Sequence, residues 1–381
     1  MVSKQLRVGV VTLVAAAGLV VFGASSGAAR TTTKAVARTA GAPVPIGVDL
    51  TYNNTAFWAA YVNYEGQYAK KMNIKLLGPD IAGASASKQN QQIEELINQG
   101  AKAVIFNPET ATSMGPAISF ANAHHVKLIS VDTIVGVGKV YMVVRASNTL
   151  YGQDACAEIS SQVKSGYVVD LEGDLTSSNG ADRTNAFNQC MKKNDPGVKI
   201  IGDPTVWDDS TAVTDAQNAI NAHPTDLKAI YSQWSSPDTG IIPILKQKGL
   251  LGKVKLISDD GVPFEMCEIG RGSLTASQSQ PANLYARYAL SYALDAAKGV
   301  KLHAGETGGG APKLMNVSYH GDSNLADPIV APFVTKGAQT LKVGRSVDGL
   351  PASSHTTAVG SKDLWGNVYG STHGGDCAGA P

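Results

Sequence analysis

From Pro45 onward, short apolar runs alternate along the chain with longer segments whose apolar residues recur at helical spacing. The short runs are rich in β-branched and large aliphatic residues, as expected of parallel strands that are covered on both faces. In the first half of the chain such strands are predicted at 46–50, 74–78, 103–107 and 127–132. Helices are predicted between them at 56–72 and 87–99, the second with Ser87 as its N-cap and Gly100 at its end.

The same alternation repeats in the second half of the chain. Strands are predicted at 166–173, 198–203, 227–232 and 253–260, with helices at 149–163, 181–193, 211–222 and 238–248. Strands that alternate with helices in this way form a doubly wound parallel sheet, and two successive units of similar size predict two α/β lobes. Ligands of such sheets bind at the carboxyl ends of the strands, so functional residues are expected just after each strand.

The last part of the chain has a weaker pattern. A further helix is predicted at 282–298, followed by the Gly-rich loop GETGGGAPK and the apolar run IVAPFV (329–334). Beyond about residue 340 the chain is rich in Gly, Ser, Thr and His and has little periodicity. We expect an irregular C-terminal tail over 341–381, held by Cys377.

The N-terminus has the layout of a secretory signal peptide. Lys4 and Arg7 precede an apolar stretch over 8–22, which is followed by the small residues Gly27 and Ala29. This order predicts a signal peptide over 1–29 with cleavage after Ala29, and a linker over 30–44. The alternative, a membrane anchor, would need an apolar run of roughly 20 residues, and this one is shorter.

Charge and cysteine content narrow the class of protein further. Lys plus Arg (32) nearly balances Asp plus Glu (31), so there is no basic surplus that would favour nucleic acid as a partner. The four cysteines are Cys156, Cys190, Cys267 and Cys377, and the first of them follows the apolar leader too far downstream to carry a lipid. We therefore expect a soluble protein in the periplasm or another extracytoplasmic space.

The cysteine spacings match no zinc pattern, and an exported protein passes through an oxidising compartment. We predict disulfides, first of all Cys156 with Cys190, because both fall on predicted helices that flank one strand. Buried free thiols are the alternative.

Motifs of catalysis are absent from the sequence. It contains no P-loop, GxSxG elbow or HExxH, and GETGGG lacks the Lys-Ser/Thr pair of a phosphate-binding loop. His124 and His125 are adjacent, and on a helix they would point about 100° apart, which makes a poor metal site. We expect neither an enzyme nor a cofactor or metal.

Polar and aromatic side chains instead gather in the segments that follow the strands. The candidate ligand-binding residues are Asn53, Asn54, Phe57, Trp58, Asp132, Arg183, Trp207, Gln233, Trp234, Asp260 and Gln280. Aromatic faces that pack on ring C–H groups, together with polar groups that hold hydroxyls, suit a sugar held between two lobes. Each residue also has a structural alternative: Trp58 as a core residue of a helix face, Asp260 as a turn former, and Arg183 as half of a surface ion pair.

At this point the chain resembles a known family. The segments AFWAAY, KQNQQIEELINQGAKAVIFNPET, KLISVDT, VVDLEGDLTSSNGADRTNAF, TVWDDSTAVTDAQNAINAHPTDLKAIYSQ, KLISDDG and GSLTASQSQ occur in the order and spacing of the sugar-binding proteins of ABC importers. They are similar to the ribose/galactose-binding group of type I periplasmic binding proteins. The resemblance covers roughly residues 45–335.

The resemblance implies two lobes that close on a monosaccharide. The aromatic contacts would match Phe57, Trp58 and Trp207. The polar contacts would match Asn53 or Asn54, Asp132, Arg183, Asp260 and Gln280. Two positions depart from the ribose-binding pattern, because Thr133 stands where an Arg often follows the aspartate and Trp234 stands where an Asn is common. These changes favour a different sugar, a cyclitol or a less polar metabolite over ribose.

The resemblance also implies three chain crossings between the lobes, near 147–149, 279–281 and 325–330. Lobe 1 would comprise 45–148 and 281–328, and lobe 2 would comprise 149–280 and 329–340. The implied function is an extracytoplasmic, monomeric binding protein that delivers its ligand to an ABC permease. The alternative is an exported sensor that reports to a chemoreceptor or histidine kinase, and a neighbouring gene pair for an ATPase and a permease would separate the two.

Overall fold

The computed structural model describes residues 41–341 and 355–373. The chain divides into a unit at Met1–Gly41 and a unit at Ala42–Pro381, and the fold below is that of the second. The expected signal peptide at 1–29, most of the linker at 30–44, and Cys377 lie outside the described residues. Within the described ranges, no helix has the length and apolar character needed to cross a membrane.

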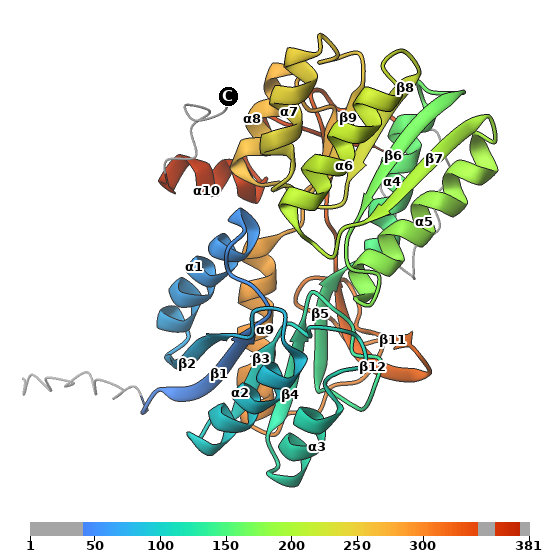
Figure 1. Cartoon of the computed structure of the whole chain (residues 1–381). Coiled ribbons are helices and arrows are strands. Elements are labelled where there is room, and N and C mark those ends of the chain that lie inside the picture. The colour runs from blue at the N-terminus through green and yellow to red at the C-terminus, as the bar shows by residue number, and fades with distance from the viewer. Residues whose placement is uncertain (1–40, 342–354, 374–381) are drawn as a thin grey trace, which may run out of the picture. The chain divides into compact units, whose positions relative to one another are not determined.

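The first sheet has seven strands in the order β11-β12-β5-β4-β3-β1-β2. Its strands are β1 (Val44–Leu50), β2 (Ile74–Ile81), β3 (Ala103–Phe106), β4 (Lys127–Val131), β5 (Met142–Ala146), β11 (Met315–Tyr319) and β12 (Asp322–Ile329). Neighbours pair in parallel except β11, which runs antiparallel to β12. Helices α1 (Ala56–Lys71) and α9 (Ala282–Ala297) cover one face, while α2 (Ala86–Asn98) and α3 (Gly115–Ala123) cover the other (Figure 1). We call this sheet with its four helices lobe 1.

The second sheet also has seven strands, in the order β14-β13-β10-β9-β8-β6-β7. They are β6 (Gly166–Glu172), β7 (Val198–Pro204), β8 (Leu227–Ser232), β9 (Lys255–Asp259), β10 (Ala276–Gln278), β13 (Phe333–Thr335) and β14 (Thr357–Ala358). Only the β10–β13 pair is antiparallel. Helices α4 (Asn148–Ser160) and α5 (Ser178–Asn194) pack on one face, and α6 (Asp209–Ala222), α7 (Asp238–Gln247) and α8 (Pro263–Arg271) on the other. This is lobe 2, and the predicted fold class of two doubly wound lobes is confirmed.

Three connections join the two sheets. The chain leaves lobe 1 between β5 and α4, returns between β10 and α9, and leaves again between β12 and β13. The run IVAPFV does not form the single strand that its composition predicts, because Ile329 ends β12 and Phe333 begins β13. Pro332 between them has no amide hydrogen for a ladder, and its carbonyl accepts a hydrogen bond from the amide of Ser279 in another connection. The exact lobe boundaries predicted above stay a proposal.

The C-terminal segment departs most from the sequence prediction. Instead of an irregular tail, residues 357–358 add β14 to the second sheet, and a helix, α10 (Trp365–His373), follows it. Leu364 and Trp365 are only 2% and 3% exposed, so two large apolar side chains anchor a segment that is otherwise rich in small and polar residues. Figure 1 shows α10 beside α8 and near α1.

The start of α2 differs slightly from the one that the sequence predicts. Helix α2 begins earlier than predicted, and its N-cap is Ser85, whose hydroxyl accepts a hydrogen bond from the amide of Lys88, and not Ser87. Serine can cap at either position, and only the backbone geometry decides between them.

The predicted disulfide is confirmed. Cys156 in α4 and Cys190 in α5 are bonded, with their Cα atoms 6.1 Å apart. Cys267 in α8 is disulfide-bonded as well, so no described cysteine is a free thiol.

Candidate ligand-binding site

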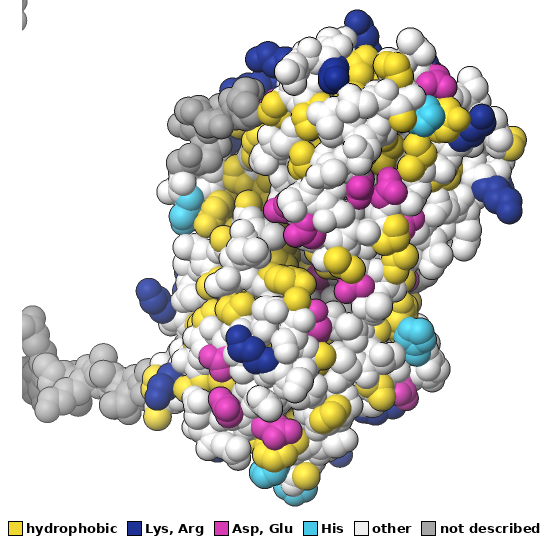
Figure 2. Space-filling view, in the orientation of Figure 1, with side chains coloured by type: hydrophobic (Ala, Val, Ile, Leu, Met, Phe, Trp, Pro, Cys, Tyr) yellow, Lys and Arg dark blue, Asp and Glu magenta, His cyan; other side chains and the backbone are white. Residues whose placement is uncertain are grey.

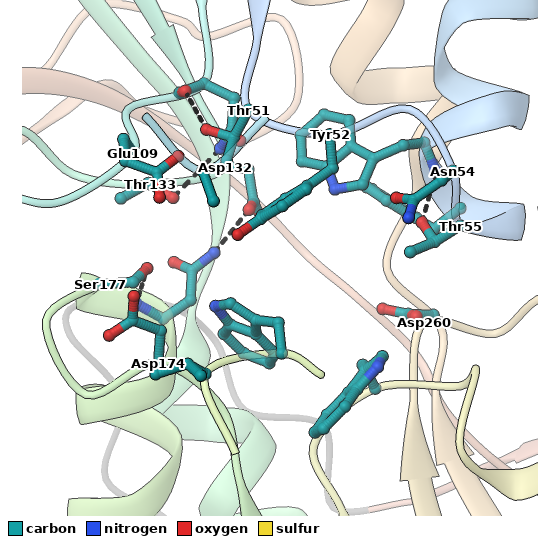
Figure 3. Close-up of a pocket in the computed structure, with 18 of the residues that line it drawn as sticks. Thr51, Tyr52, Asn54, Thr55, Glu109, Asp132, Thr133, Asp174, Ser177 and Asp260 are labelled. Atoms are coloured by element: carbon teal, nitrogen blue, oxygen red, sulfur yellow. Dashed lines mark hydrogen bonds between the residues drawn. The ribbon is translucent and has the colours of Figure 1, made fainter. Parts of the chain in front are cut away.

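A cavity of about 410 Å³ lies at the carboxyl ends of strands from both sheets. Its size falls within the range of small-molecule sites, roughly 300–1,000 Å³. Nine of the predicted residues line it: Asn54, Phe57, Trp58, Asp132, Arg183, Trp207, Trp234, Asp260 and Gln280. Figure 2 shows this face of the molecule hollowed between the lobes, with acidic side chains around the hollow. Figure 3 shows how side chains from both lobes point into the cavity.

The lobes touch directly beside the cavity. The amide of Ala111 donates to the carbonyl of Thr176 at 3.3 Å, and the amide of Ile134 donates to the hydroxyl of Ser178 at 2.9 Å. An ion pair also joins Arg145 of β5 to Asp182 of α5 at 3.1 Å. The structure is therefore a form in which the lobes are closed on the cavity.

Arg183 occupies the floor of the cavity, near the start of α5, and is 3% exposed. Its Nε donates to Asn148 at 2.6 Å, one terminal nitrogen donates to the carbonyl of Gln233, and the other donates to Gln280 Oε1 at 3.0 Å. Asp259 lies 3.6 Å from the guanidinium. Burial is the largest single effect and lowers the pKa of Arg183, but Asp259, Tyr231, Tyr151 and Asp260 together outweigh it and hold the pKa above its usual value.

Asp132 follows β4 and faces Arg183 from lobe 1. Its φ of 70° lies in the left-handed region, which aims the carboxylate into the cavity at a cost in backbone energy. One oxygen accepts from Asn179 at 2.5 Å and the other from Gln280 at 3.0 Å, and both donors are neutral amides. Burial raises the pKa of Asp132 to about 6, although Arg183 lowers it.

Asp260 follows β9 and is the matching carboxylate of lobe 2. Its φ of 106° is again in the region that favours glycine. The side chain accepts from the amide and the hydroxyl of Ser235, at 3.0 and 2.8 Å. Burial raises the pKa of Asp260, and Arg183 opposes that shift.

Aromatic rings line two walls of the cavity. In lobe 1, Phe57 and Trp58 begin α1 and pack edge to face with their centroids 5.1 Å apart. In lobe 2, Trp207 packs edge to face on Trp234 at 5.4 Å. Trp207 lies so close to Gly173 that a Cβ atom at that position would come within 2.1 Å of its ring, so a glycine is required there.

Two of the predicted residues, Asn53 and Gln233, do not line the cavity. Gln233 is fully buried behind the wall, where its amide nitrogen donates to Asp170 and Thr184 and its oxygen accepts from the amide of Gly173. It holds the strand ends together instead of facing the cavity. Asn53 is exposed and lies outside the lining residues, although its neighbours Tyr52 and Asn54 line the cavity.

Other lining residues were not predicted, chiefly Tyr52, Asn107, Glu109, Thr133, Asp174 and Asn179. Asn107 follows β3 directly, four others lie two or three residues after the end of a strand, and Asn179 lies in α5. The signal that could have found the first five is therefore a place within three residues of a strand end. The described residues hold no group of three or more His, Cys, Asp or Glu arranged to bind a metal ion.

The comparisons with known proteins agree with this geometry. Residues 46–301 match the family model of the periplasmic binding protein domain. A ribose import binding protein of Bacillus subtilis is 26% identical over 259 residues, which cover 68% of this chain and 83% of the relative. A xylitol-binding protein of Mycolicibacterium smegmatis is 26% identical over 288 residues, which cover 74% of this chain and 78% of the relative.

Solved structures share the fold. The Caulobacter myo-inositol binding protein, solved with myo-inositol, is 24% identical with a TM-score of 0.66, and the match covers 78% of this chain and 94% of that one. A galactofuranose binding protein is 23% identical with a TM-score of 0.63, covering 68% and 91% of the two chains. Because the family model matches well over half of its length, this chain belongs to the periplasmic binding protein domain family.

Proposed function

We propose that this protein captures a small polyhydroxylated molecule, a sugar or a cyclitol, in the cavity between its lobes and delivers it to an ABC importer. The family is one of binding proteins, not enzymes, and relatives are named for the import of ribose and the binding of xylitol. The proposal carries that chemistry to this chain because the cavity has the matching groups.

The observation that carries the proposal is the joint arrangement of rings and buried polar groups. Phe57 and Trp58 on one lobe and Trp207 on the other offer apolar surfaces for the C–H faces of a ring. Asp132, Asp260 and Arg183 are each at most 6% exposed and belong to the cavity wall. A buried carboxylate favours hydroxyl donors, because an unpaired polar group is costly once water is excluded.

Thr133 and Trp234 bear on which ligand fits. Thr133 accepts a hydrogen bond from Asn107 and brings no positive charge, and the indole of Trp234 donates to Asp209 at 2.7 Å. The site therefore supplies fewer charged donors and more aromatic surface than the ribose-binding pattern, which favours a ligand other than ribose.

A thermal-shift screen across neutral monosaccharides, pentitols and inositols, together with their amino derivatives, tests the function. A ligand that binds only the folded state stabilises it by mass action, by about 2.7 kcal/mol when its free concentration is a hundred times its Kd. The melting temperature rises as a result. The proposal expects at least one such compound, with calorimetry giving one site per chain. A complete absence of binding across the screen would refute it.

A further inference from the structure

The cavity wall carries an unusual excess of negative charge. Six lining residues have carboxylates: Glu109, Asp132, Asp174, Asp208, Asp209 and Asp260. Arg183 is the only Lys or Arg among the described residues that line the cavity. Its charge is already matched by Asp259 behind the wall, at 3.6 Å. A neutral sugar would leave this imbalance uncompensated.

Several of these carboxylates have a structural task. Asp208 caps α6 by accepting from the amide of Thr211 at 2.8 Å, where the helix N-terminus favours a negative charge. Asp209 accepts a hydrogen bond from the indole of Trp234. The carboxylates of Asp132 and Asp260 accept hydrogen bonds from neutral amide and hydroxyl groups. Glu109 and Asp174 are accounted for only in part, because Thr51 forms a side-chain hydrogen bond with Glu109 and Thr176 donates to Asp174, while Oε2 of Glu109 has no partner.

Glu109 and Asp174 belong to opposite lobes and lie on the same side of the cavity, with a gap between them (Figure 3). Glu109 follows β3, Asp174 follows β6, and the hydrogen bond from Ala111 to Thr176 joins the two loops two residues further on. One oxygen of Asp174 accepts from the amide and hydroxyl of Thr176, both at 2.7 Å. Oε2 of Glu109 is buried and has no hydrogen-bond partner.

Two like charges brought together by closure repel each other, and the repulsion grows as water leaves the cavity. Burial raises the pKa of Glu109, a side-chain hydrogen bond with Thr51 lowers it, and the nearby charge of Asp174 raises it. Tyr52 lies close to both carboxylates. Burial, and after it the charges of Glu109 and Asp174, raises the pKa of the Tyr52 hydroxyl to about 12. A cation between Glu109 and Asp174 would remove the repulsion and contact an aromatic ring as well.

We propose that the ligand is a polyhydroxylated molecule that also carries a protonated amine, such as an amino sugar or an aminocyclitol, and that the amine lies between Glu109 and Asp174. The inference rests on the proposed function and adds the charge of the ligand to it. The ammonium bridges the two lobes, so that binding and closure are coupled through one ionic contact. The hydroxyl groups of the ligand form hydrogen bonds with Asp132, Asp260 and Arg183.

Calorimetry with matched pairs of compounds tests this inference. Each neutral monosaccharide or inositol, for example D-glucose, D-galactose and myo-inositol, is compared with its amino analogues substituted at each available ring position. The N-acetyl forms serve as controls that keep the nitrogen and lose the charge. The inference expects at least one amine to bind at least about tenfold more tightly than its neutral and acetylated partners. That preference should shrink as salt is raised from about 0.01 M to 1 M.

Variants separate the ionic contact from the rest of the site. Glu109→Gln and Asp174→Asn should each reduce the preference for the amine, measured as the ratio of the affinities of the amine and its neutral partner for the same variant, to about threefold or less. Glu95→Gln, which removes the same charge from the exposed surface of α2, is the matched control and should leave the preference unchanged. If a neutral compound binds and no amine exceeds it, the inference is wrong while the proposed function stands. If nothing in either series binds, both are wrong.

Discussion

At the scale of single residues, Arg183 is more than a ligand contact. The alternative that Arg183 is half of a surface ion pair does not hold, because it lies within α5 and is 3% exposed. Arg183→Ala would leave Asp259 buried without its counter-charge. We expect a loss of about 3–5 kcal/mol in the free energy of unfolding, measured by denaturant titration without ligand. A loss below about 1 kcal/mol would contradict this account of the ion pair.

Asp132 gives the site a pH dependence with a definite sign. Its pKa in the ligand-free folded protein is about 6, raised above the ordinary value of about 3.9 by burial. A hydroxyl ligand donates to the ionised carboxylate, so binding must lower that pKa. The affinity should be flat above pH 7 and fall as pH drops through 6, by at most about tenfold per pH unit.

Titration calorimetry between pH 5 and 8 measures that dependence. The profile should become shallower in Asp132→Asn, since Asp260, with a raised pKa of its own, still titrates. An affinity that rises toward pH 5 would show that the ligand binds the protonated acid.

The positions of most candidate residues could be predicted because parallel strands deliver their following residues to one edge of the sheet. Gln233 shows the limit of that rule. It follows β8 directly, as Asp260 follows β9, yet its side chain turns inward to Asp170 and Thr184. The direction of a side chain depends on the loop backbone, and the sequence alone does not reveal that Asp132 and Asp260 take positive φ values.

At the scale of secondary structure, α10 connects the two lobes. Trp365 packs edge to face on Phe57 of α1, 6.1 Å between centroids, and its indole donates to the carbonyl of Asp260 at 3.2 Å. Both partners are cavity residues. Trp365→Ala should cost about 3–5 kcal/mol of stability through lost packing and should weaken ligand binding by loosening Phe57 and Asp260 together.

Val368, on the same helix and 46% exposed, provides the matched control for Trp365. Val368→Ala should change neither stability nor affinity by more than about 0.5 kcal/mol. Thermal melts and calorimetry on both variants measure the effect. An unchanged melting temperature in Trp365→Ala would mean that α10 does not support the lobes.

The cysteines make a second prediction at this scale. Cys156, Cys190 and Cys267 are bonded, so thiol labelling of the denatured, unreduced protein should detect at most one of the four cysteines. After reduction it should detect four. Replacing both Cys156 and Cys190 by Ser should cost about 2–4 kcal/mol, because the bridge closes a loop with a sequence separation of 34. Two or more thiols before reduction would contradict the bridges.

Strands with continuous apolar runs, such as β3 and β8, were predictable because both of their faces are buried. Short elements were not. Strand β10 has only three residues, Ala276–Gln278, and two of them are polar although all three are buried. Its place in the sheet follows from its neighbours β9 and β13, and pairing of that kind leaves no periodic signal in a short segment.

At the scale of the whole molecule, three connections join the two lobes, and the cavity is closed by contacts between them. The lobes are linked beside the site by direct contacts such as Arg145 with Asp182, yet carboxylates face each other across the same boundary. Under the proposed function, a ligand that contacts both lobes stabilises the closed form, and an ABC importer would distinguish that form from an open one. The division into two similar lobes could be predicted from the repeated pattern, whereas the contribution of residues 355–373 could not.

The most direct measurement is a calorimetric titration of the parent protein, Trp207→Ala and Trp207→Phe with a compound found in the screen. If the cavity between the lobes binds the ligand, loss of the Trp207 ring should weaken binding by roughly 2–4 kcal/mol, and the Phe variant should recover part of that loss. Trp207 is only partly buried, so the fold should remain intact in both variants. Binding by Trp207→Ala within about twofold of the parent protein would contradict the site described here.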